Sequence, residues 1–250
     1  MEITIILFLF AILAGLIKGF SGFGLSLILI SVLFEMGFTA NEFLPILVPL
    51  FVVLDLILYF ENRKHLVLDY KENFTIHHIT LMTLFVGTMI GTYFLKIIDA
   101  EFLKLSLGFL ILIALFLLIE KISAYQMKIP NEKNNGIFGF VTGILTGLFT
   151  MNGIPTTIYL MYHQYPKDKY MANLVTFLLF SDIVLVSVYL FGGLFTLSGL
   201  LVSLKLMFMV LLGFVGGIFL RKKVSNKIFK TIIIIILMLN AMKIIFNFFF

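Results

Sequence analysis

Three charged side chains stand within long apolar stretches of this sequence. Lys18 comes one residue before a glycine-rich break, Asp182 lies in the middle of the run 170–191, and Asp55 lies nearer the end of its own run. A charge inside a membrane is costly, so it pairs with an opposite charge or serves a substrate or ion path. We therefore expect ion-handling chemistry. Lys18 is either the counter-ion of an anionic substrate or the partner of a carboxylate, and each aspartate either couples transport to a proton or cation or is structural.

Two short segments interrupt the apolar pattern with glycine, proline and small polar residues, FSGFGLS at 20–26 and LFTMNGIPT at 148–156. Glycine permits a sharp turn, and Pro155 suits the first turn of a helix. We therefore predict helix starts near Leu25 and near Pro155. The free N–H groups and partial positive charge of helix N-termini favour anions.

The two breaks predict one central anion site if their tips meet near the middle of the membrane. The alternative is that their glycines and small polar residues only let helices pack closely. Glycines spaced four apart at 139, 143 and 147, and the pairs at 87/91 and 213/217, favour packing on their own helices. The candidate substrate-binding residues are Lys18, Ser21, Gly22, Phe23, Gly24, Ser26, Thr150, Asn152, Gly153, Thr156 and Thr157.

The elements that position these residues must be membrane helices. The chain has 250 residues, of which 61% are hydrophobic and 12% charged, whereas a soluble domain is about 25% charged. Apolar runs near 20 residues match the roughly 30 Å hydrocarbon core of a bilayer. We predict an all-α, multi-pass protein embedded in the lipid of a prokaryotic cytoplasmic membrane.

Several other classes of function are disfavoured. The chain has no cysteine, which excludes disulfides and thiolate metal sites. Its histidines lack metal-ligand spacing, and no phosphate-binding loop or nucleophile–base cluster can be placed. The net charge of +5 is spread over loops, which argues against nucleic-acid binding. We predict neither an enzyme nor a cofactor or metal site, and the sequence leaves open a coupling ion and a homodimer.

The sequence consists of two similar halves. Three landmarks recur in the same order at offsets of about 128, 127 and 126 residues. Internal duplication is typical of secondary transporters. We predict a first membrane repeat at 1–120, a cytoplasmic linker at 121–135 and a second repeat at 136–250. The paired landmarks are Ala14–Gly19 with Thr142–Gly147, Asp55 with Asp182, and Gly87–Gly91 with Gly213–Gly217.

Loop charges suggest how the breaks enter the membrane. If both broken segments span, the lysines and arginines of the loops divide seven against nine. If both are re-entrant hairpins, they divide thirteen against three, a clear positive-inside bias. Each half would then hold one hairpin and three spans, and an odd number of crossings inverts the second half. We predict inverted repeats, six full spans and both termini outside.

The broken motif and its repeat resemble the sulfite exporter TauE/SafE family over nearly the whole chain. Ser21–Gly22–Phe23–Gly24–Leu25–Ser26 stands where the family has a Gly-x-Gly-Gly-Gly type element, and Asn152–Gly153–Ile154–Pro155 looks like the counterpart in the second half. The resemblance implies a transporter, often an exporter, of sulfite, organosulfonates or related anions. An anion channel and a membrane scaffold without transport are the alternatives.

Overall fold

The computed structural model describes residues 5–66, 78–99, 132–162 and 165–225, with short pieces at 102–103, 106, 109, 227–229, 231–232 and 235. Within these ranges every regular element is a helix, as predicted. The elements are α1 (Ile5–Ser21), α2 (Leu25–Glu35), α3 (Ala40–Asn62), the short 3-10 helix η1 (Arg63–His65), α4 (His78–Ile97), α6 (Glu132–Phe149), α7 (Gly153–Tyr162), α8 (Lys167–Phe191) and α9 (Leu197–Lys223).

Four of the described helices are long and apolar enough to cross a membrane: α3 with η1, α4, α8 and α9. They coincide with four of the six predicted spans, which confirms a multi-pass membrane protein. The apolar runs at 102–119 and 228–248, which supply the other two predicted spans, lie largely outside the described residues, as does the predicted linker up to residue 131. The described chain resumes in α6 at Glu132, inside the predicted linker.

Both predicted breaks are present, and each separates two short helices. Helix α2 begins at Leu25, as predicted, and Pro155 is the third residue of α7. The first turn needs positive φ angles at Gly22 (85°) and Gly24 (94°), a conformation that glycine adopts without steric cost. In the second break the non-glycine residue Thr150 has φ 53°, so local sequence alone did not identify the residue that makes this turn.

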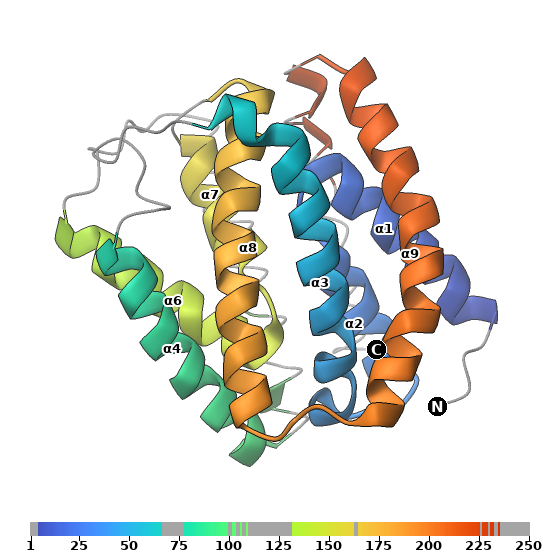
Figure 1. Ribbon diagram of the computed structural model, residues 1–250, viewed down its shortest axis with the longest axis vertical. Coiled ribbons are helices and arrows are strands. Elements are labelled where there is room, and N and C mark those ends of the chain that lie inside the picture. Colours follow the sequence, from blue (N-terminus) through green and yellow to red (C-terminus); the bar gives the residue numbers. More distant parts are fainter. Residues whose placement is uncertain are drawn as a thin grey trace.

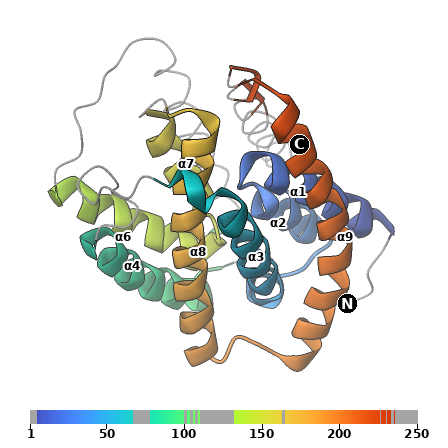
Figure 2. The same ribbon diagram turned by 45° about the horizontal axis from the view of Figure 1, so that its top comes forward.

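Helices α3 and α8 form the middle of the molecule, with a helix pair on either side (Figures 1 and 2). Helix α1 packs on α9 at one side, and α4 packs on α6 at the other. Each outer pair therefore joins the first helix of a broken segment from one half to a long helix from the other half. The two halves are interlocked and share one core.

Glycines make the two outer pairs possible. A Cβ atom added to any of them would overlap a backbone carbonyl oxygen of the facing helix. Such small-residue stripes let membrane helices approach backbone to backbone. The packing role predicted for the glycines spaced four apart on α4, α6 and α9 is confirmed, whereas that of Gly15 and Gly19 on α1 was not predicted. The glycines are Gly15, Gly19, Gly213 and Gly217 between α1 and α9, and Gly87, Gly91, Gly139, Gly143 and Gly147 between α4 and α6.

Two neighbouring glycines of α9 offer a matched test of this packing. In Gly217→Ala the new Cβ would overlap the carbonyl oxygen of Leu16, whereas in Gly216→Ala it would meet nothing within 4 Å. We expect Gly217→Ala to destabilise the protein by about 1–3 kcal/mol, the usual cost of overpacking. Gly216→Ala should be neutral or slightly stabilising, because alanine favours helix. Thermal unfolding in one detergent measures both, and an equal loss in the two variants would contradict the packing described here.

Candidate functional site

The tips of the two broken segments meet. The first residue of α7 and the chain just before α2 touch, since a Cβ added to Gly153 would lie 2.5 Å from the Cβ of Phe23. A small cavity lies where they meet, closed on its other sides by Phe51 of α3 and Leu178 of α8. Eight residues that the sequence singled out line this cavity, namely Lys18, Phe23, Gly24, Ser26, Asp55, Thr150, Asn152 and Gly153.

The cavity between the tips is very small. Its free space is about 10 Å³, which holds about one water molecule. Its polar groups, including the hydroxyl of Ser26 and the amide of Asn152, belong to residues that are at most 8% exposed. An anion with several heavy atoms therefore fits only if the two tips move apart.

A buried ion pair connects α1 to α3 at this cavity. Nζ of Lys18 lies 2.5 Å from Oδ1 of Asp55, and the two side chains are 4% and 1% exposed. The structure shows the carboxylate partner that the sequence allowed for Lys18, and a role of Lys18 as the counter-ion of a substrate stays a prediction. Asp55, although nearer the end of its apolar run than Asp182, is fully buried.

Asp182 of α8 completes the buried charge cluster. Its Oδ1 accepts a 2.9 Å hydrogen bond from Nδ2 of Asn152, which ties the second tip to α8. Asp182 also lies close enough to interact with the charges of Asp55 and Lys18. Its Oδ2 is buried and receives no hydrogen bond from the described residues. One lysine and two aspartates thus share a water-poor space, which we call the charge cluster.

The remaining predicted residues lie behind the cavity and hold the tips in shape. The hydroxyl oxygen of Ser21 is 2.8 Å from the carbonyl oxygens of both Ile17 and Phe23. The Thr156 hydroxyl donates to the carbonyl oxygen of Asn152 at 2.7 Å, and the Thr157 hydroxyl accepts from Tyr170 at 3.0 Å. These residues, together with the turn residue Gly22, support the turns and do not line the cavity.

Sequence reasoning missed the apolar walls. Phe51, Met151, Ile154 and Leu178 all line the cavity, but each stands among many similar residues and gives no signal of its own. The sequence allowed Asp182 to cap a broken helix by a hydrogen bond, but it did not identify Asn152 as the partner.

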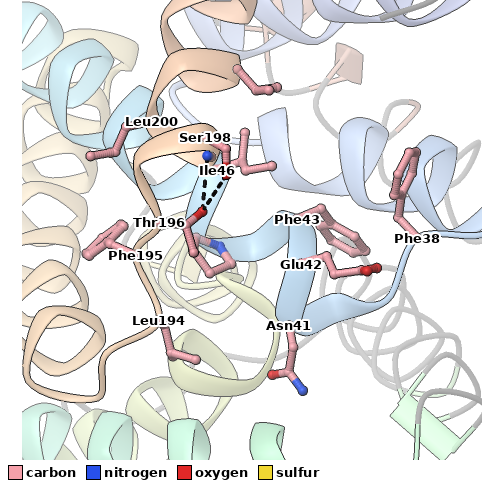
Figure 3. A pocket seen from close by; sticks show the side chains of 13 residues that line it. Phe38, Asn41, Glu42, Phe43, Ile46, Leu194, Phe195, Thr196, Ser198 and Leu200 are labelled. Carbon is pink, nitrogen blue, oxygen red and sulfur yellow. Dashed lines mark hydrogen bonds between the residues drawn. The ribbon is translucent and has the colours of Figure 1, made fainter. Parts of the chain in front are cut away.

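A much larger cavity lies elsewhere, at the N-terminal ends of α3 and α9 (Figure 3). Its volume is about 390 Å³, and Glu42 is its one charged lining residue within the described chain. The helix ends beside it are capped by their own side chains, with Thr39 N–H donating to Glu42 and Gly199 N–H donating to Thr196. No residue singled out from the sequence lines it. Without a cation there, the cavity is a poor candidate for an anion site.

A second, partly buried ion pair lies at the opposite ends of α3 and α9. Glu61 accepts a 2.8 Å hydrogen bond from Arg221 and forms a 2.8 Å ion pair with Lys222. Arg221 is nearly fully buried, whereas Lys222 is 64% exposed. The pair fastens the C-terminal ends of one helix from each half.

Arg221 and Lys222 pair with the same carboxylate but differ in burial, and this difference gives a prediction. We expect Glu61→Gln to destabilise the protein by about 2 kcal/mol, because Arg221 would remain as a buried charge without a full partner. Lys222→Ala should cost less than about 1 kcal/mol, since exposed ion pairs contribute little. Thermal unfolding of the purified variants distinguishes them. Equal effects would show that burial of Arg221 does not determine the strength of its ion pair with Glu61.

Helices long enough to cross a membrane, two broken segments that meet, and a buried charge cluster between them define a class: a multi-pass membrane transport protein. The family model described as "Sulfite exporter TauE/SafE" matches residues 7–244. The chain belongs to this family of membrane transporters, which confirms the resemblance noted in the sequence. No curated protein and no solved structure matched the chain.

Proposed function

We propose that the protein is a secondary transporter that carries a small anion across the cytoplasmic membrane by alternating access. The anion would be sulfite, an organosulfonate or a related sulfur-containing or carboxylate anion, held between the two tips. The observation that carries this proposal is the meeting of both breaks at a buried cavity beside Lys18, the one cation that lines it within the described chain. The family description favours export as the direction.

The proposal includes inverted repeats with hairpins that enter from opposite faces of the membrane. Asp55 and Asp182 mark α3 and α8 as equivalent helices of the two halves. The C-terminal end of α3 contacts Arg221 near the C-terminal end of α9, and Lys167 at the N-terminal end of α8 reaches the carbonyl oxygen of Val224 just after α9. The equivalent helices α3 and α8 therefore run in opposite directions, which supports inversion.

Access to the site would alternate through movements at the two ends of α3 and α9. At one end residues of both helices line a cavity of about 390 Å³. At the other end the Glu61–Arg221 pair holds them together. This asymmetry supports a carrier whose two sides open in turn, and the small space between the tips argues against a continuous pore.

Asp182 and Asp55 are the residues that we propose for coupling to a proton or cation. Both are buried carboxylates at the level of the tips, and neither is exposed by more than 2%. An ionisable group inside the membrane is a functional candidate by default. The opposing possibility, a purely structural pair with Lys18, predicts that neutral variants transport normally.

The experiment that tests the proposal starts with thermal stabilisation of the purified protein. Sulfite, sulfonates, sulfate and carboxylates are screened, because a ligand that binds the folded state raises the melting temperature. Anions that stabilise are then followed in proteoliposomes. Saturable flux with counter-transport supports a carrier, while high unitary conductance would assign a channel. If no anion flux occurs, and Asn152→Ala and Ser21→Ala leave the cellular phenotype intact, the protein is a scaffold.

A further inference from the structure

The charge cluster cannot hold an anion in its fully ionised form. Lys18 contributes one positive charge, and Asp55 and Asp182 contribute two negative charges, all on side chains that are at most 4% exposed. An uncompensated buried charge costs several kcal/mol. The three groups together are neutral only if the two aspartates hold one proton between them. Oδ2 of Asp182, which receives no hydrogen bond from the described residues, belongs to the residue that interacts directly with Asp55.

We propose that Lys18 exchanges Asp55 for the transported anion, and that each singly charged anion binds together with one proton. This inference rests on the proposed function, because it assumes that the anion binds between the tips. When the anion arrives, the ammonium group of Lys18 leaves the Asp55 carboxylate and pairs with the anion. The freed carboxylate takes up one proton from the water phase. The site then holds one cation, one anion and two neutral carboxyl groups.

Among the residues that the structure describes, no other charged group lines the cavity and could balance the anion. The charged groups of the cluster come from α1 (Lys18), α3 (Asp55) and α8 (Asp182). Helices α2 and α7 and the two turns contribute only neutral residues to the cavity, such as Ser26, Thr150 and Asn152. The titratable phenols nearby on α8 are engaged elsewhere, Tyr170 with Thr157 and Tyr189 with the carbonyl oxygen of Gly147. The equivalent of Lys18 in the second half is the neutral Thr146, which is 3.3 Å from Ser181.

A single lysine also determines the charge of the substrate. With both carboxyl groups protonated, a monoanion gives a neutral site, whereas a dianion leaves one negative charge in the membrane interior. We therefore infer selection of sulfonates and of the singly charged form of sulfite over the sulfate dianion. The proton and the anion cross together, so the step moves no net charge.

The experiment is isothermal titration of methanesulfonate into the purified full chain, in several buffers of different ionisation enthalpy at one pH. Methanesulfonate keeps one negative charge over the working pH range, so any proton taken up binds to the protein. We expect one proton per bound anion, and an apparent Kd that rises up to tenfold for each unit increase in pH. Sulfate should bind at least tenfold more weakly.

Neutral variants of the two aspartates show which groups take up the proton when the anion binds. Asp55→Asn and Asp182→Asn alone should each keep the uptake of one proton, because one carboxylate still balances Lys18 in each. The double variant should bind methanesulfonate with no proton uptake and no pH dependence. Asp99→Asn removes an exposed carboxylate outside the cluster and should behave as wild type. If the double variant does not fold, the number of protons taken up by the wild type and its preference for methanesulfonate over sulfate still test the exchange at Lys18.

The outcomes separate this inference from the proposed function. Methanesulfonate binding without proton uptake, or sulfate binding of equal strength, overturns the exchange at Lys18 and leaves an anion transporter in place. If methanesulfonate, sulfite and sulfate all fail to bind and to be transported, the proposed function itself is overturned, and the exchange mechanism with it.

Discussion

Lys18→Met is expected to reduce anion binding and flux by at least about 100-fold. Lys18 is the one positive side chain that lines the cavity between the tips in the described chain. Removing one partner of a buried charge pair costs about 2–5 kcal/mol, and each 1.4 kcal/mol is tenfold in affinity. Uptake of labelled sulfite or methanesulfonate into proteoliposomes measures the effect.

Stability and function must be separated in this experiment, because Lys18→Met leaves Asp55 buried without its partner. The double variant Lys18→Met with Asp55→Asn removes both charges of the pair. It should fold at least as well as Lys18→Met and still fail to bind the anion. Lys205→Met, which replaces an exposed lysine of α9, is the matched control and should transport normally. Wild-type flux in Lys18→Met would contradict a role for this lysine in anion binding.

Gly153→Ala should weaken anion binding by at least about tenfold through a purely steric effect. The new Cβ would lie 2.5 Å from the Cβ of Phe23, closer than carbon atoms approach without a shift. Gly153 and Phe23 both line the cavity, so the added methyl group occupies part of the space that the anion needs when the tips move apart.

The control for Gly153→Ala is Gly216→Ala, which adds the same methyl group in open space on α9. Binding is measured as the shift in melting temperature with increasing anion, and folding as the melting temperature without anion. If Gly153→Ala binds as wild type while it remains folded, the contact between the tips is not part of the site.

The parts of the site that local sequence governs were predictable. Gly22 and Gly24 permit the first turn and Pro155 suits a first helical turn, so the positions of the breaks and the helix starts at Leu25 and near Pro155 follow from residue type, whereas the turn residue Thr150 does not. The four-residue spacing of the glycines likewise predicted close helix packing, because that spacing places them on one helix face.

Contacts between helices far apart in the sequence were harder to predict. Lys18 and Asp55 are 37 positions apart, and their pairing depends on how α1 lies against α3, which no local pattern encodes. Composition singled out both residues as costly charges but left their partners open. Thr156 and Thr157 were grouped with the ligand-binding residues because they are polar and near the break. In the structure the Thr156 hydroxyl donates to Asn152 within the second tip and the Thr157 hydroxyl accepts from Tyr170 of α8, and their role in binding stays a prediction.

The most direct test of the account is a structure of the protein with selenite, an analogue of sulfite that carries an anomalous scatterer. The account predicts one selenium peak between the two tips, beside Phe23 and Asn152, with Nζ of Lys18 turned from Asp55 toward the anion. A peak only in the large cavity at the N-terminal ends of α3 and α9 would contradict a site between the tips.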